Sequence, residues 1–192
     1  MDIERINPEL RRLYRWLPHL RMDRRWLLRL MRRLPAPRAS QGTASVTVED
    51  HSLAHAGVRI YRPTRQAHGA ALLWIHGGGM IIGSVSQNDR ECIRYANELG
   101  ILVASVAYRL APEHPFPAPL DDCFEVWEWL TSRAGELAIE PERIVVSGQS
   151  AGGGLAASLA QKVCDAGGPQ PAGQALFCPM LDDRTAARRE LD

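Results

Sequence analysis

A serine stands between small residues at the point where a predicted strand meets a predicted helix. The segment 148–152 reads Gly-Gln-Ser-Ala-Gly, directly after the apolar run at 144–146 and directly before a helix-forming run. A sharp turn at this point holds the serine backbone in a sparsely populated conformation, so its neighbours must lack bulk and its Oγ is left exposed above the sheet. The pattern predicts that Ser150 is a nucleophile.

A run of three glycines follows another predicted strand further upstream. His76 precedes Gly77, Gly78 and Gly79, directly after the strand predicted to end at Ile75. Consecutive glycines destabilise regular structure, so a folded chain that contains them usually needs their bare backbone. The N–H groups of Gly78 and Gly79, together with that of Ala151, would form an oxyanion hole. A flexible glycine loop and a phosphate-binding turn are the alternatives, and the presence of the serine turn argues against both.

Strands and helices are predicted to alternate around these two motifs. Period-two alternation predicts a hairpin, apolar runs predict buried strands, and spacings of three and four predict helices. The predicted strands are 45–48, 58–61, 70–75, 101–108, 143–147 and 174–178, and the predicted helices are 8–34, 88–99, 120–131 and 151–166. Asn88 with Glu91 should cap the second of these helices, and Gly100 should end it. Strand–helix alternation indicates an α/β protein with a mostly parallel sheet.

Charge is distributed unevenly along an otherwise ordinary composition. The chain has 192 residues, 45% hydrophobic and 23% charged, with a net charge of +1, so nothing global indicates nucleic-acid binding. Residues 1–38 carry eleven arginines against four acidic residues, a local charge of +7 that leaves −6 on the remainder. A basic amphipathic helix can lie on a membrane surface. We favour the alternative that it packs on the main body and exposes a solvated face.

Cysteine usage and hydropathy point to a cytoplasmic protein without a metal. The four cysteines are widely spaced, with no Cys-x-x-Cys pair and no histidine cluster, which argues against a metal site or a disulfide framework. No apolar stretch approaches the ~20 residues that span a bilayer. Acidic residues at positions 2 and 4 and the lack of an apolar core argue against a signal peptide. A cytoplasmic location is therefore expected.

Three motifs in order resemble the hormone-sensitive-lipase-like branch of the α/β-hydrolases. They are the His-Gly-Gly-Gly run at 76–79, Tyr-Arg-Leu-Ala-Pro-Glu-His-Pro-Phe-Pro-Ala at 108–118, and the Gly-x-Ser-Ala-Gly-Gly turn at 148–153. The resemblance covers about 58–184 and implies an α/β-hydrolase fold. It further implies hydrolysis of carboxylic esters with short acyl chains, without a cofactor. Residues 1–38 would then be a helical cap segment over the acyl pocket, and 39–192 a partial hydrolase domain.

The resemblance also implies a role for each matching residue. Ser150 would form the acyl-enzyme, and the amides of Gly78, Gly79 and Ala151 would bind the oxyanion. Ser84 resembles a family position at the mouth of the substrate pocket. His76 would anchor the glycine loop, since it precedes the glycines at a strand end. The segment 108–118, which includes His114, would be structural.

Two departures from the family pattern bear on activity. Gln149 precedes the nucleophile where this branch most often has Asp. In this fold the catalytic triad follows the chain order Ser, then Asp or Glu, then His, but only 42 residues follow Ser150 and none of them is His. The resemblance therefore predicts a fold without its last strands and helices, whose final strand is an exposed edge open to self-association. An inactive fragment and a ligand-binding relative without catalysis are the alternatives to an esterase.

Overall fold

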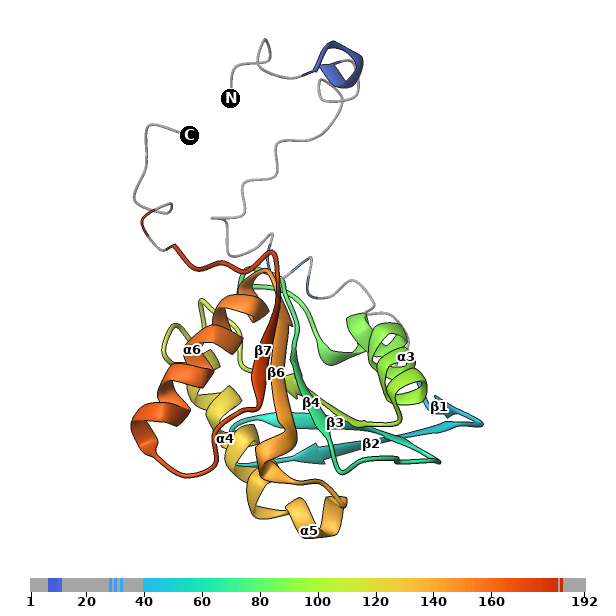
Figure 1. The fold of residues 1–192 in the computed structure, drawn as a ribbon. Coiled ribbons are helices and arrows are strands. Elements are labelled where there is room, and N and C mark those ends of the chain that lie inside the picture. Colours follow the sequence, from blue (N-terminus) through green and yellow to red (C-terminus); the bar gives the residue numbers. More distant parts are fainter. Residues whose placement is uncertain are drawn as a thin grey trace.

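A seven-stranded mixed sheet is the centre of the molecule, shown in a computed structural model (Figure 1). The structure describes residues 7–11, 28, 30, 32, 40–182 and 184. The strands are β1 (Gly42–Thr43), β2 (Val46–Ser52), β3 (Gly57–Pro63), β4 (Ala71–Ile75), β5 (Leu102–Ala107), β6 (Ile144–Gln149) and β7 (Gly173–Phe177). Their spatial order is β1-β2-β3-β5-β4-β6-β7.

The sheet divides into an antiparallel part and a parallel part. Strands β1, β2, β3 and β5 pair antiparallel in succession, whereas β5, β4, β6 and β7 run parallel to one another. The helices are α3 (Asp89–Leu99), α4 (Ala118–Ser132), α5 (Ala134–Leu137) and α6 (Ala151–Ala166), with short 3₁₀ turns η2 (Val85–Asn88) and η3 (Pro141–Arg143). Each predicted strand and helix from residue 45 onward is present, with bounds that shift by a few residues.

Helices cover both faces of the parallel strands, with α3 on one face and α4 and α6 on the other (Figure 1). Strand β4 shows the consequence. Leu73 and Ile75 pack with α4 and α6 in the larger core cluster, while Leu72 and Trp74 join the smaller cluster against α3. A strand covered on both faces needs apolar residues at every position, which explains its unbroken apolar run.

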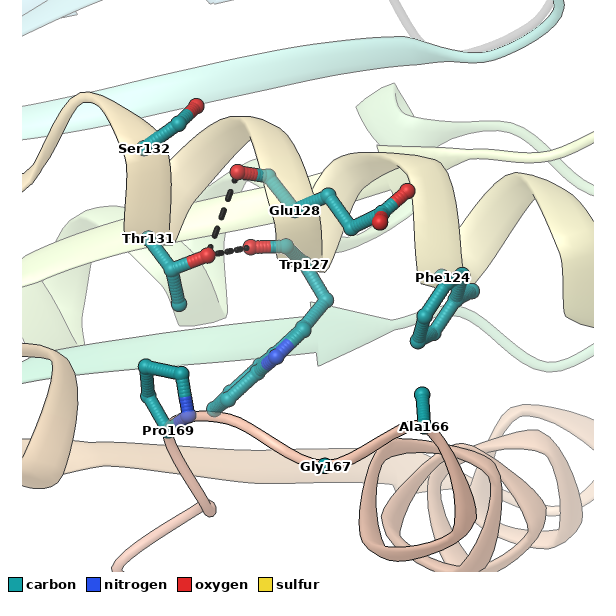
Figure 2. Close-up of a pocket in the computed structure, with 8 residues that line it drawn as sticks. All are labelled: Phe124, Trp127, Glu128, Thr131, Ser132, Ala166, Gly167 and Pro169. Carbon is teal, nitrogen blue, oxygen red and sulfur yellow. Dashed lines mark hydrogen bonds between the residues drawn. The ribbon is translucent and has the colours of Figure 1, made fainter.

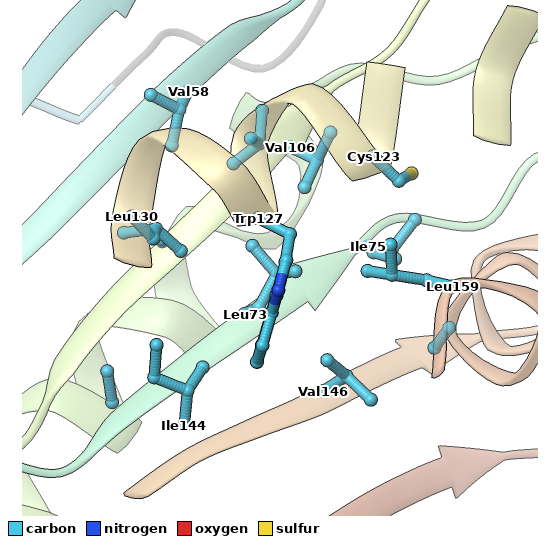
Figure 3. Packing of buried hydrophobic residues seen from close by; sticks show 14 of the residues in the cluster. Val58, Leu73, Ile75, Val106, Cys123, Trp127, Leu130, Ile144, Val146 and Leu159 are labelled. Carbon is cyan, nitrogen blue, oxygen red and sulfur yellow. The ribbon is translucent and has the colours of Figure 1, made fainter. Parts of the chain in front are cut away.

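The larger cluster joins strands and helices that are far apart in the sequence. Figure 3 shows Trp127 of α4 among residues of β4, β6 and α6, including Leu73, Val146 and Leu159. Trp127 is only 3% exposed. Burial of an aromatic side chain of this size is a large hydrophobic contribution, so this packing holds α4 and α6 against the sheet.

Asn88 is at the predicted N-cap of α3, but the prediction that its side chain caps the helix is wrong. The side chain makes no capping hydrogen bond, and its Oδ1 is buried without a partner among the described residues. The cause is the 3₁₀ turn η2, which leads into the helix and places Asn88 at φ −112°, ψ 15° rather than in the extended backbone of a capping residue. The other end is as expected, because Gly100 adopts the left-handed conformation at φ 63°.

The N-terminal segment 1–38 lies mostly outside the described residues. Of the described residues in this segment, 8–11, 28, 30 and 32 are helical and residue 7 is not. Its function as a cap stays a prediction. No helix within the described part of the chain is long and apolar enough to cross a membrane.

Candidate active site

Ser150 occupies the turn between β6 and α6 in a strained backbone conformation. Its φ is 56° and its ψ is −119°, a region that residues with a Cβ rarely adopt. Close contacts on both sides explain the flanking glycines. A Cβ on Gly148 would lie 2.3 Å from the carbonyl oxygen of Gly152, and one on Gly152 would lie 2.1 Å from that of Ile75. The small residues of the motif are therefore required by backbone packing.

The chain after β7 holds the serine backbone from a second direction. The N–H of Ser150 donates to the carbonyl of Phe177 at 2.9 Å, and the carbonyl of Ser150 accepts from the N–H of Met180 at 3.0 Å. The same carbonyl accepts from the N–H of Gly154 at 3.1 Å. These bonds satisfy the backbone groups of Ser150 and stabilise its unusual conformation.

The glycine loop lies directly against this turn. A Cβ on Gly77 would be 2.8 Å from the carbonyl oxygen of Gln149 and 3.4 Å from the Cβ of Ser150. Three successive residues then have positive φ: Gly78 at 122°, Gly79 at 63° and Met80 at 61°. The fold thus brings together two motifs that are about seventy residues apart in the sequence.

The loop leaves two amides available next to the serine. The carbonyl of Gly78 closes the loop by accepting from the N–H groups of Ile81 at 3.1 Å and Ile82 at 3.0 Å. Within residues 40–182, no acceptor pairs with the N–H of Gly78 or Gly79. Ala151, buried at the first position of α6, presents its N–H at a helix N-terminus, which favours negative charge. Three N–H donors of this kind can stabilise the anionic oxygen of a tetrahedral intermediate.

His76 packs against the glycine loop. Its ring is 1% exposed, stacks on Tyr108 with centroids 4.2 Å apart, and its Nδ1 lies 2.8 Å from the carbonyl oxygen of Gly77. Burial lowers the pKa of His76 below its usual value of 6.5, so the ring is neutral near pH 7. The contact of its Nδ1 with Gly77 agrees with the predicted role of His76 as an anchor of the loop, which stays a prediction.

The segment 108–118 forms the floor on which the loop rests. Tyr108 donates its hydroxyl to the carbonyl of His76 at 2.9 Å, and the N–H of Ala111 donates to the carbonyl of Met80 at 2.8 Å. Arg109 forms a two-pronged ion pair with Asp122 of α4, whose carboxylate is 1% exposed and also accepts the Arg109 N–H at 2.7 Å. Hydrogen bonds from its guanidinium to the Asp122 carboxylate raise the pKa of Arg109.

Ser84 lies just beyond the glycine loop, at the residue before η2. It is half-buried, and its Oγ is 2.9 Å from the Oγ of Ser86. No distance ties it to Ser150, and its contribution to a substrate pocket stays a prediction.

The groove in Figure 2 is separate from this site. It has a volume of about 400 Å³ and lies between α4 and the loop after α6. Its lining residues are Phe124, Trp127, Glu128, Thr131, Ser132, Ala166, Gly167 and Pro169. None of them belongs to the serine turn or the glycine loop, and the Thr131 hydroxyl already donates to backbone carbonyls of its own helix.

The structure does not supply a base for the serine among residues 40–182. No side chain there hydrogen-bonds to the Oγ of Ser150, and His114 lies exposed in the floor segment. The described residues also hold no group of three or more metal-ligating side chains. The contacts that fix Ser150 through Phe177 and Met180 were not predicted from sequence, because they involve backbone groups and leave no residue-type signature.

The family model for the alpha/beta hydrolase fold matches residues 72–192, which contain both motifs of the site. The chain belongs to the α/β-hydrolase family. This confirms the resemblance drawn from the three motifs. A bacterial heroin esterase superposes on this hydrolase with a TM-score of 0.72 and 36% identity, covering 95% of this chain and 60% of that one.

Curated relatives of this chain are named as ester hydrolases. An ethyl acetate hydrolase from Pseudomonas putida is 42% identical over 123 residues, which make up 62% of this chain and 38% of that protein. Carboxylesterase NlhH from Mycobacterium tuberculosis is 39% identical over 134 residues, 69% of this chain and 42% of that protein. The chain thus spans about two fifths of the length of these relatives.

Proposed function

We propose that this α/β-hydrolase acts on small carboxylic esters through an acyl-enzyme at Ser150. The observation that carries the proposal is the contact between the two motifs, with Gly77 held against Gln149 and Ser150. In the first step the Oγ of Ser150 loses its proton and bonds to the ester carbonyl carbon, so that the carbonyl oxygen becomes an anion. The carbonyl then re-forms as the C–O bond to the alcohol breaks, and the alcohol leaves with the proton that the serine lost. Water then releases the carboxylic acid and restores the serine.

The oxyanion of this reaction would be bound by the amides of Gly78, Gly79 and Ala151. These donors are backbone groups held by the loop and the helix, so they need no reorganisation as charge develops on the oxygen. Loss of one such donor typically costs about 10²–10³ in rate. The mechanism requires no cofactor. Ser84 would contact the substrate at the mouth of the pocket.

A short acyl group is the proposed substrate preference. One relative is named an ethyl acetate hydrolase, whose acyl group has two carbons. The general base that takes the serine proton is not assigned to a residue here, because no histidine follows Ser150 in the sequence and none contacts it among residues 40–182. For that reason, ligand binding without turnover is the second candidate function. The cytoplasmic location stays a prediction.

Hydrolysis of p-nitrophenyl butyrate by the 192-residue chain tests the proposal. We expect turnover that Ser150→Ala abolishes and that the control Ser158→Ala, on the same helix, retains. Mass spectrometry of the quenched reaction should show one butyryl group on the peptide that contains Ser150. Equal rates for the chain and Ser150→Ala would contradict the proposal. Saturable binding of the ester without turnover would favour the second candidate.

A further inference from the structure

One arginine of the N-terminal segment contacts the loop that carries the oxyanion amides. The Nε of Arg32 donates to the carbonyl of Ile81 at 2.9 Å. Its Nη1 pairs with the Oε2 of Glu113 at 2.7 Å, and its Nη2 donates to the carbonyl of Ala111. A single guanidinium therefore joins the glycine loop to the floor segment, from a residue more than forty positions upstream of the loop.

The loop needs such a restraint because its glycine residues can adopt many backbone conformations. Gly78 and Gly79 lack a Cβ and adopt positive φ, a conformation in which glycine retains wide freedom. The base of the loop is fixed by His76 and by the contact of Gly77 with the serine turn. The other end is held by the bond from Ala111 to Met80 and by Arg32.

The bond from Arg32 falls within the closed part of the loop. Ile81 donates its N–H to the carbonyl of Gly78, and its own carbonyl accepts from Arg32. A restraint on Ile81 therefore limits rotation of the peptide groups between Gly78 and Ile82. The first of these peptide groups carries the free N–H of Gly79, and the peptide group that precedes it carries the free N–H of Gly78.

The guanidinium group of Arg32 is well suited to restraining the backbone of the glycine loop. A planar guanidinium donates in several fixed directions at once, which a lysine ammonium cannot reproduce, and bonds that involve an ionised group are stronger than neutral ones. The side chain of Arg32 is 24% exposed and that of Glu113 45% exposed, so bulk water reaches the pair only in part. Two of its three acceptors are backbone carbonyls, whose positions depend directly on loop conformation.

We propose that Arg32 is a positioning residue for the oxyanion hole, and that the N-terminal segment acts through it on the conformation of residues 78–82. The assignment to the oxyanion hole rests on the proposed function. The effect on the loop does not, because it is a property of the folded chain without substrate.

Hydrogen exchange tests the effect on the loop directly. In the full chain, Arg32→Ala should speed exchange of the Ile81 and Ile82 amides about tenfold or more, since each is protected by its bond to Gly78. Arg32→Lys should give an intermediate rate. The matched control is Arg133→Ala, which removes an exposed arginine and its ion pair with Glu136 at the far end of α4. Strand β6 provides the internal reference, and its exchange should not change.

Unchanged exchange at residues 78–82 in Arg32→Ala would overturn the proposal. Faster exchange spread equally over β6 and the loop would also overturn it, because that is the signature of a general loss of stability. If the chain hydrolyses p-nitrophenyl butyrate, Arg32→Ala should lower kcat about tenfold while KM changes less than about twofold. If the chain shows no hydrolysis, the proposed function fails, and the exchange result still decides whether Arg32 positions the loop.

Discussion

His76 illustrates how one buried side chain links the site to the stability of the protein. Its ring fills the space between Tyr108 and the glycine loop, where it is 1% exposed. Burial lowers its pKa below 6.5, so the folded chain keeps the ring neutral at pH values where an unfolded chain binds a proton. The residue that positions the loop should therefore also make the fold sensitive to acid.

The unfolding free energy should fall as the pH drops below about 6.5, because only the unfolded state gains a proton there. The contribution is present above that pH and is lost as the pH falls through the folded-state pKa, with a slope of up to about 1.4 kcal/mol per pH unit. Urea unfolding at several pH values between 5.5 and 7.5 measures the slope. His76→Phe should flatten it, whereas His114→Gln, at an exposed position, should not.

A direct readout covers the case in which His76→Phe does not fold. The Cε1 proton of His76 in the NMR spectrum of the unmodified chain should titrate at a lower pH than the ordinary histidine value of 6.5. A midpoint at or above 6.5 for this signal would refute the prediction, since the folded state would then bind the proton as readily as the unfolded state.

At the scale of elements, the site depends on how closely α6 approaches the end of β4. Gly152 lies in the first turn of α6, where an added Cβ would be 2.1 Å from the carbonyl oxygen of Ile75 and 2.4 Å from that of His76. Both obstacles are backbone atoms, so no side-chain rotation can relieve the clash. The helix would have to move away from the sheet and carry Ser150 and Ala151 with it.

Gly152→Ala should therefore lower the unfolding free energy by about 3 kcal/mol, at the upper end of typical overpacking costs. Chemical unfolding monitored by circular dichroism provides the measurement. Gly135→Ala in α5 is the matched control, because nothing lies within 4 Å of its added Cβ and its backbone φ is not positive. In that position alanine should be neutral or stabilise by up to about 1 kcal/mol. Equal stability of the two variants would contradict the packing argument.

Elements with a periodic signal were predictable from the sequence, and contacts made by backbone groups were not. The apolar runs and helical spacings of residues 45–178 predict β2 to β7, α3, α4 and α6, and the glycines around Ser150 predict the turn, whereas the short elements β1 and α5 were not predicted. The order of the strands in the sheet was not predicted from the sequence. The capping of α3 failed because the 3₁₀ turn before it has no clear signature in residue type.

The role of Arg32 could not be predicted from the sequence, for a different reason. It is one of eleven arginines in residues 1–38, and nothing in its spacing separates it from the others. Its contacts to Ile81 and Ala111 depend on where the segment meets the body, which is a tertiary property. The nucleophile and the oxyanion amides were predictable because their chemistry demands rare local sequences, whereas a positioning arginine does not.

Across the whole molecule, the described sheet ends on one side at the two-residue strand β1 and on the other at the five-residue strand β7. Strand β7 pairs only with β6 within the described residues, and its outer edge presents unpaired backbone groups. Apolar side chains continue from this edge into the following segment, with Phe177 48% exposed, Met180 54% and Leu181 65%. An edge strand with neighbouring exposed apolar residues favours pairing with a strand from another chain.

The purified 192-residue chain should therefore associate as its concentration rises through the micromolar range, by pairing at β7. Light scattering coupled to size-exclusion chromatography measures the mass.

Phe177→Lys should shift the population toward the monomer, because natural sheets also use a charge on an edge strand to oppose pairing. Gln161→Lys adds the same charge on the exposed face of α6 and should leave association unchanged. A strictly monomeric chain would contradict the prediction, and an association that both lysines weaken equally would lie elsewhere than at β7. The association would also affect the serine turn, since the carbonyl of Phe177 accepts from the N–H of Ser150.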